Sequence, residues 1–208
     1  MHERDVERYD RLAPRYERGF VQRRFFAPMQ RSALEVALAG SPPPRRMLDV
    51  GCGTGALLRL AAKRLPEAEL TGVDASEGML RVAGKKAPAR SPAIRFVLAP
   101  AEALPFSDAT FDLVVSTVSF HHWSDQPKGI AEAARVLVPG GRLVLTDHFA
   151  LPWLRPAFAA FGHRHRIHTR EEIAAMMAEA GLSPEGWDDA YRLGPLPLVT
   201  SATGVKQG

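Results

Sequence analysis

A loop of three alternating glycines, Gly51-Cys52-Gly53-Thr54-Gly55, constrains the fold of this chain more than any other feature. The short apolar run Met47–Val50, which carries Asp49, precedes the loop, and the helix-periodic stretch Ala56–Arg64 follows it. A strand, a glycine loop and a helix in this order are typical of nucleotide-type folds, in which amides at the helix N-terminus face the negative end of a ligand. The G-x-G-x-G spacing differs from the G-x-G-x-x-G of dinucleotide sites. The alternative is a tight turn that only packs the helix against the strand.

A second acidic residue, Asp74, follows the apolar run Leu70–Val73 and lies 19 residues after Gly55. This interval is close to the roughly 20 residues expected for a ribose-binding carboxylate. A carboxylate at a strand end can accept hydrogen bonds from both ribose hydroxyls. Asp74 or Ser76 could equally cap the helix that contains Met79, and the two interpretations are compatible.

Five strand candidates alternate with helical patterns along the chain. They are Arg46–Val50, Glu69–Val73, Ile94–Leu98, Phe111–Ser116 and Gly141–Asp147. This alternation predicts a parallel sheet with helices on both faces, and ligands of such sheets bind at the carboxyl ends of the strands, where the strand order reverses. Asp49, Asp74, the Ala99–Glu102 turn and Ser116 all fall at predicted strand ends, which favours a single site.

Capping signals place the later helices. Ser124 or Asp125 is the predicted cap of one helix, and Pro139-Gly140-Gly141 is its predicted end. The Thr-Arg-Glu-Glu segment at 169–172 is a capping-box pattern that opens a further helix.

The composition suits one globular domain: the chain has 208 residues, of which 46% are hydrophobic and 24% charged. Cys52 is its only cysteine, which excludes an intramolecular disulfide and fits a reducing compartment. The sequence has no signal-peptide pattern and no run of 18 apolar residues, so we expect a cytoplasmic protein without a membrane span. The net charge of +4 is too mild to indicate a nucleic-acid partner.

Four segments in a fixed order resemble the class I S-adenosylmethionine-dependent methyltransferases, in the small-molecule group that includes the ubiquinone/menaquinone biosynthesis methyltransferases. They are Asp49–Gly55, Gly72–Leu80, Ala101–Phe106 and Phe111–Ser116. The resemblance covers roughly Tyr9 to Leu182. It implies a Rossmann-like, doubly wound α/β fold: a mostly parallel seven-stranded sheet with helices on both faces and a C-terminal antiparallel hairpin, which Trp187–Leu193 and Leu196–Thr200 would supply.

The resemblance also divides the chain. Residues 1–208 would form a single methyltransferase domain, with an N-terminal helical lid at 1–44, a cofactor-binding core at 45–150, an acceptor-side insertion at 151–168, and a C-terminal helix and hairpin at 169–208.

The cofactor implied by the resemblance is S-adenosyl-L-methionine. The expected cofactor-binding residues are Tyr9, Tyr16, Asp49, Gly51, Cys52, Gly53, Asp74, Ala75, Met79, Ala101, Glu102 and Ser116. Family members usually have an acidic residue before the Ala-Glu pair, whereas this chain has Pro100, which removes a side-chain acceptor for the adenine amino group. Tyr9 and Tyr16 are two helical turns apart and share a face, which fits either a lid over the cofactor or core packing.

His121 and His122 follow the fourth strand, where the transferable methyl group should point in this family. A histidine with a pKa near 6.5 can take a proton at neutral pH, so either is a candidate general base. The alternative is a capping or hydrogen-bonded loop histidine. His148, after the fifth strand, is a weaker candidate.

We expect no metal site in the segment 163–168, where histidines alternate with arginines. The arginines would repel a cation, no carboxylate or cysteine lies within the segment, and zinc normally needs three or four suitable ligands. The segment would instead belong to an acceptor lid, in which arginines could pair with an anionic substrate.

The acceptor is expected between Tyr9–Phe26 and Ala150–His168, since both segments carry aromatic residues. These are Phe20, Phe25, Phe26, Trp153, Phe158 and Phe161. Their composition favours a partly apolar small molecule, with Arg155, Arg164 or Arg166 available for an acidic group. The predicted reaction is direct displacement at the sulfonium methyl group, for which alignment supplies much of the rate.

Two other functions stay open at this point. A nucleic-acid methyltransferase would usually carry an Asn/Asp-Pro-Pro-aromatic segment after the fourth strand, or a cysteine nucleophile there, and Ser116-Thr117-Val118-Ser119 stands in that place. A non-catalytic S-adenosylmethionine-binding protein would keep the glycine loop and Asp74 but need no acceptor pocket. The sequence does not indicate an oligomeric state.

Overall fold

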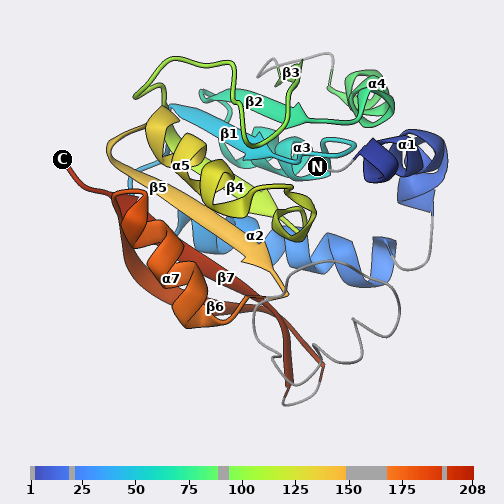
Figure 1. The fold of residues 1–208 in the computed structure, drawn as a ribbon. Coiled ribbons are helices and arrows are strands. Elements are labelled where there is room, and N and C mark those ends of the chain that lie inside the picture. Colours follow the sequence, from blue (N-terminus) through green and yellow to red (C-terminus); the bar gives the residue numbers. More distant parts are fainter. Residues whose placement is uncertain (1–2, 19–21, 89–93, 149–167, 194–195) are drawn as a thin grey trace.

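The computed structural model describes residues 3–18, 22–88, 94–148, 168–193 and 196–208, which form one seven-stranded sheet in the order β3-β2-β1-β4-β5-β7-β6 (Figure 1). The strands are β1 (Arg46–Val50), β2 (Glu69–Asp74), β3 (Ile94–Leu98), β4 (Phe111–Thr117), β5 (Leu137–Asp147), β6 (Leu182–Leu193) and β7 (Leu196–Lys206). Neighbours among β1 to β5 pair in parallel, and β7 runs antiparallel to both β5 and β6. The predicted α/β sheet with a C-terminal hairpin is confirmed.

Helices cover both faces of this sheet. In Figure 1, α5 (Gln126–Val136) and α7 (Arg170–Glu179) lie in front of the sheet, and α2 (Ala27–Leu38) and α3 (Ala56–Arg64) lie behind it. The N-terminal segment consists of α1 (Glu3–Leu12), η1 (Ala13–Arg18) and η2 (Gln22–Phe26), and α1 contacts α4 (Glu77–Lys86). Within the described ranges, no helix is long and apolar enough to cross a membrane.

Alternating strand residues divide the core into two layers, because successive side chains of a strand point to opposite faces. On the α5 and α7 side, Leu48 and Val114 pack with Ile130, Ile173 and Met177. On the α2 and α3 side, Met47, Leu113 and Val115 of the strands pack with Leu34 of α2 and with Leu58 and Ala61 of α3. Strands that are buried on both faces read as continuous apolar runs, which is why β1, β2 and β4 are visible in the sequence.

The strand order reverses at β1, and this reversal positions the site. β1 pairs with β2 on one side and with β4 on the other, so Asp49 lies opposite Gly72 and Val115. The carboxyl ends of these strands therefore meet at one edge of the sheet, where the loops of a doubly wound fold open a crevice.

Two element boundaries differ from the prediction. The helix predicted to end at Pro139-Gly140-Gly141 ends at Val136, and β5 begins at Leu137. The extra strand residues pair Leu137 with Phe111, and the register then shifts before Arg142 meets Leu113. The Pro-Gly-Gly segment is thus an irregular part of the strand and not a helix terminator. β6 and β7 also extend beyond the predicted hairpin.

The predicted helix caps are present. The Asp125 side chain accepts from the Lys128 amide at 3.0 Å, which makes Asp125, and not Ser124, the cap of α5. Thr169 and Glu172 form the full capping box of α7. Ser76 caps α4 by accepting from the Met79 amide at 3.1 Å.

Candidate functional site

The glycine loop connects β1 to α3 and is hydrogen-bonded to the end of β2. Gly51 and Cys52 both donate their amides to the Val73 carbonyl, at 2.8 and 2.9 Å. Gly51 has a φ of +74°, and a Cβ at this position would overlap the Ser119 side chain. The left-handed backbone and the close approach of the β4 loop therefore both require glycine here.

The Asp74 carboxylate anchors the loop to the start of α4. Its Oδ2 accepts from the Gly53 amide and its Oδ1 from the Ser76 amide, each at 2.8 Å. Burial raises the pKa of Asp74, although these amide hydrogen bonds oppose the rise. Ser76, and not Asp74, caps α4, and the binding of a ribose by Asp74 stays a prediction.

Asp49 is a buried carboxyl at the end of β1, with 2% of its surface exposed. Burial, together with the nearby charge of Asp74, raises the pKa of Asp49 to about 8. A carboxyl with this pKa would gain a large electrostatic benefit from a cationic partner.

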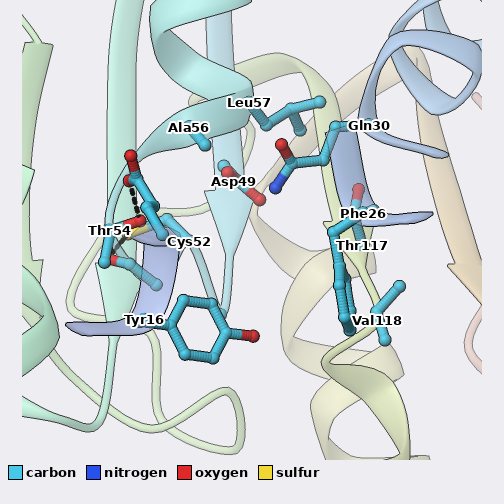
Figure 2. Close-up of a pocket in the computed structure, with 13 residues that line it drawn as sticks. Tyr16, Phe26, Gln30, Asp49, Cys52, Thr54, Ala56, Leu57, Thr117 and Val118 are labelled. Carbon is cyan, nitrogen blue, oxygen red and sulfur yellow. Dashed lines mark hydrogen bonds between the residues drawn. The ribbon is translucent and has the colours of Figure 1, made fainter. Parts of the chain in front are cut away.

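Two adjoining pockets lie over these residues. The first, of about 540 Å³ including its open mouth, is lined by Tyr16, Glu17, Phe26, Gln30, Asp49, Gly51, Cys52, Gly53, Thr54, Ala56, Leu57, Thr117 and Val118 (Figure 2). The second, of about 380 Å³ by the same measure, is lined by Tyr9, Tyr16, Gly51, Gly53, Asp74, Met79, Val118, Ser119 and His122. The two share Tyr16, Gly51, Gly53 and Val118, so they form one elongated site.

His121 and Asp147 form a buried pair between the turn η3 (Phe120–His122) and the end of β5. The Nδ1 atom of His121 lies 2.8 Å from Oδ1 of Asp147. Burial opposes the charged forms of both groups, but their mutual attraction outweighs it: the pKa of His121 is raised and that of Asp147 is lowered. Since the carboxylate can only accept, Nδ1 carries a hydrogen and Nε2 is the basic nitrogen of the neutral ring.

His122 stands beside this pair and contacts the N-terminal segment. The ring centroids of His121 and His122 lie 3.9 Å apart, and the Tyr9 hydroxyl lies 2.7 Å from Nε2 of His122. Burial, with the nearby Tyr16, raises the pKa of Tyr9 far above its ordinary value, so its phenol stays neutral. His148 adjoins the same pair: its amide donates to Oδ1 of Asp147 at 2.7 Å, its ring centroid lies 5.9 Å from that of His121, and its Nδ1 lies 3.2 Å from the Leu198 carbonyl.

Comparisons with known proteins identify the family. Residues 48–145 match the family model described as a methyltransferase domain. A demethylmenaquinone methyltransferase from Thermus thermophilus is 38% identical over 160 residues, which are 77% of this chain and 70% of the relative. The chain belongs to the S-adenosylmethionine-dependent methyltransferases.

Further comparisons agree with this assignment. A malonyl-(acyl-carrier protein) O-methyltransferase from Methylococcus capsulatus is 36% identical over 166 residues, 76% of this methyltransferase and 60% of the relative. A solved S-adenosylmethionine-dependent methyltransferase from Thermotoga maritima, described as a possible histamine N-methyltransferase, has the same fold, with a TM-score of 0.72 and 22% identity over 96% of this chain and 98% of that chain. The methyl donor of this methyltransferase is therefore S-adenosylmethionine.

The residues present fit this cofactor. Among the described residues, the first pocket has no Lys, Arg or His in its lining, and it contains the buried Asp49 carboxyl, which suits the ammonium group of a methionine moiety. In Figure 2 the Gln30 side chain points toward Asp49. The second pocket contains Asp74, which suits a ribose.

The N-terminal segment lies over both pockets. Tyr9 and Tyr16 contact edge to face, with ring centroids 6.2 Å apart, and both line the second pocket. Glu17 fixes the segment to the core: it accepts from the Thr54 hydroxyl, and from Arg59 and Lys86 at 2.9 and 2.7 Å. The role of the two tyrosines as a lid stays a prediction.

Four predicted cofactor residues line neither pocket, namely Ala75, Ala101, Glu102 and Ser116. Glu102 has a structural contact instead: its Oε1 accepts from the amide and the hydroxyl of Ser124, at 2.6 and 2.8 Å. These bonds hold the loop before α5, so a role of Glu102 in adenine binding stays a prediction. Pro100 is exposed, and its carbonyl accepts from the Ala103 amide at 3.3 Å.

Some residues of the site were missed in the sequence. Asp147 was recognised only as the end of a strand, although its position at the same sheet edge as His121 is a detectable signal. Gln30 and Thr117 have no motif around them and enter the first pocket only through the packing of α2 and the end of β4, whereas Phe26, which also lines this pocket, is one of the aromatic residues expected near the acceptor.

The predicted acceptor-side insertion at 151–168 lies outside the described residues except for His168. The same holds for Phe20, Trp153, Phe158, Phe161, Arg155, Arg164 and Arg166. His168 is buried, with Nε2 at 2.6 Å from Oε1 of Gln126 and Nδ1 at 3.0 Å from Glu172. In the described part of the chain, no group of three or more His, Cys, Asp or Glu side chains could hold a metal ion.

Proposed function

We propose that this methyltransferase modifies a small, partly apolar acceptor and that the His121–Asp147 pair removes the acceptor proton. The observation that carries the proposal is the position of the pair: His121 itself lines neither pocket, but it adjoins His122, which lines the same pocket as Asp74. S-adenosylmethionine supplies an electrophilic methyl group on its sulfonium.

The chain's own residues would divide the cofactor between the two pockets. Asp49 would hold the methionine ammonium in the first pocket, and Asp74 would hold the ribose in the second. Tyr9, Tyr16 and Met79 would cover the nucleoside side. Because Gly51 and Gly53 line both pockets, the backbone of the loop would run along the middle of the cofactor without Cβ atoms in the way.

His121 is the better base of the two adjacent histidines. Asp147 fixes its tautomer and orientation, so Nε2 can take a proton while the resulting imidazolium stays paired with a carboxylate. The Nε2 atom of His122 is hydrogen-bonded to the Tyr9 hydroxyl. We therefore assign proton removal to His121, and positioning of the lid tyrosine to His122.

A cluster of apolar residues beside the first pocket supports an apolar acceptor. Met29, Ala190 and Val199 are its buried centre, and Phe25, Phe26, Val118, Tyr191 and Leu198 pack against them. Phe26 and Val118 belong to both the cluster and the pocket lining. The C-terminal hairpin thus joins the N-terminal segment as a wall for an apolar ring or chain.

A transfer assay with isotope-labelled S-adenosylmethionine tests this proposal. The acceptor panel contains quinols, phenols, carboxylic acids and, as the contrasting class, transfer RNA. We expect turnover on an apolar small molecule and about 10²–10⁴-fold slower turnover by His121→Ala, with unchanged binding of S-adenosylhomocysteine. Labelling of RNA alone would contradict the acceptor class, and full turnover by His121→Ala would contradict the base.

A further inference from the structure

Asp10 contacts the start of α4 although it lines neither pocket. This residue is in α1, and its Oδ1 accepts from the Ser76 hydroxyl at 2.5 Å and from the Gly78 amide at 2.8 Å. Amides in the first turn of a helix have no intrahelical partner, so Asp10 supplies an acceptor that the Gly78 amide would otherwise lack. Its negative charge also lies at the positive end of the helix.

Ser76 connects this contact to the proposed ribose ligand. While its hydroxyl donates to Asp10, its backbone amide donates to Oδ1 of Asp74 at 2.8 Å. Asp74 in turn accepts from the Gly53 amide at 2.8 Å through Oδ2. A continuous chain of hydrogen bonds therefore runs from the N-terminal segment to the glycine loop.

Gly78 makes the close approach of α1 possible. A Cβ on Gly78 would lie 2.8 Å from the Asp10 Cα and 3.0 Å from the Asp10 carbonyl oxygen, both of which are backbone atoms that cannot rotate away. The other glycine of the same helix, Gly84, has nothing within 4 Å of such a Cβ. A side chain at Gly78 would therefore meet α1, whereas one at Gly84, which is exposed near the end of the same helix, would not.

The position of α1 also decides where the two tyrosines lie. Tyr9 is the neighbour of Asp10 in the same helix, and its hydroxyl reaches His122 at 2.7 Å. Tyr9 also packs against Tyr16, and both line the pocket that contains Asp74. A shift of α1 away from Gly78 would therefore move the cover of this pocket.

We propose that Asp10 is a positioning residue of the cofactor site, which seats α1 on Ser76 and Gly78 and so holds Tyr9 over the nucleoside pocket. The inference rests on the proposed placement of the cofactor in the two pockets. Its consequence is kinetic: the demethylated cofactor leaves only after the contact of Asp10 with α4 breaks.

The dissociation rate of S-adenosylhomocysteine, measured by stopped-flow displacement, tests the consequence. We expect Asp10→Ala and Gly78→Ala to release the ligand about ten-fold faster or more, because the first loses two hydrogen bonds to a charged group and the second displaces α1. Asp10→Asn keeps an Oδ1 acceptor and should restore most of the slow release. Gly84→Ala is the control, since it makes the same substitution in the same helix without touching α1, and should release at the wild-type rate.

Amide hydrogen exchange at Gly78 gives a second readout that needs no ligand. We expect protection of this amide in the wild type and its loss in Asp10→Ala, with the rest of α4 still protected. If Gly78→Ala and Gly84→Ala release the ligand equally, or if Asp10→Ala releases it at the wild-type rate, the positioning role of Asp10 is wrong. If the wild type does not bind S-adenosylhomocysteine, or binds it with no dependence on Asp74, the proposed cofactor placement fails instead.

Discussion

Asp147 receives the Nδ1 hydrogen of His121 at 2.8 Å and also accepts the backbone amide of His121 at 3.1 Å. One carboxylate therefore fixes both the ring and the turn that carries it. The charge of Asp147 raises the pKa of His121 despite burial, which makes the ring a stronger base but requires a higher pH to keep it neutral.

The His121–Asp147 pair predicts a pH dependence of the methyl-transfer rate. With Asp147→Asn the ring loses its carboxylate, so the pKa of His121 should fall and the rise of rate with pH should move to lower pH. The plateau rate should fall as well, since an uncharged amide stabilises the imidazolium less. A profile of kcat/KM against pH checks both, and an unchanged inflection would show that another group titrates.

The raised pKa of Asp49 predicts that a proton is released when the cofactor binds. With a pKa of about 8 it is mostly protonated at pH 7, and an ammonium group bound beside it would favour the carboxylate. Affinity for S-adenosylhomocysteine should therefore rise from pH 6 to 8. Calorimetry in buffers of different ionisation enthalpy should detect the released proton, and Asp49→Asn should abolish it; equal heats in all buffers for the wild type would contradict the assignment.

Asp74→Ala should weaken the binding of S-adenosylhomocysteine by about 1.5–3 kcal/mol, the scale of hydrogen bonds to a charged group. The variant also removes the acceptor of the Gly53 and Ser76 amides, so its unfolding must be measured alongside binding. If a folded Asp74→Ala variant binds S-adenosylhomocysteine with unaltered affinity, Asp74 does not bind the cofactor.

Pro100→Asp should not weaken cofactor binding. The residue is exposed and supplies only its carbonyl to the Ala103 amide, which an aspartate also provides. The new carboxylate restores the acceptor that most family members have in this turn. A large loss of affinity by calorimetry would show that the locked φ of proline shapes the turn.

Glu102→Ala should lower the free energy of unfolding by about 1–3 kcal/mol, because the amides of Ser124 and Asp125 lose a charged acceptor that is itself buried. If its role is only structural, affinity for S-adenosylhomocysteine should stay near that of the wild type. Chemical denaturation and calorimetry on the same preparation separate the two roles, and weakened binding without destabilisation would favour the predicted adenine contact.

Local patterns predicted the fold because each relies on residues close in sequence. The glycine loop, the capping box of Thr169 and the apolar strands need only their neighbours to be recognised. The end of α5 was misplaced because Leu137 pairs with Phe111 across the sheet, and this long-range pairing overrides the Pro-Gly-Gly signal.

The site was predicted less completely for the same reason. Asp147 meets His121 only because β4 and β5 are neighbours, and Asp10 meets Ser76 only because α1 folds back onto α4. The spacing of the residues reveals neither pairing, and only the predicted sheet edge brings Asp147 near His121. Motif reasoning finds groups that act together within one loop, while groups that converge from distant segments need the structure.

The insertion of β7 between β5 and β6 has a consequence for how the enzyme is made. β5 ends in Asp147 and pairs on its outer side with β7, with Asp147 opposite Thr200. During synthesis this edge stays bare until residues 196–206 have left the ribosome, so the carboxylate that orients His121 is among the last parts of the sheet to be enclosed. Nascent chains should therefore form the cofactor pocket before this edge of β5 is paired, and the exposed edge is the point at which premature pairing between chains would begin.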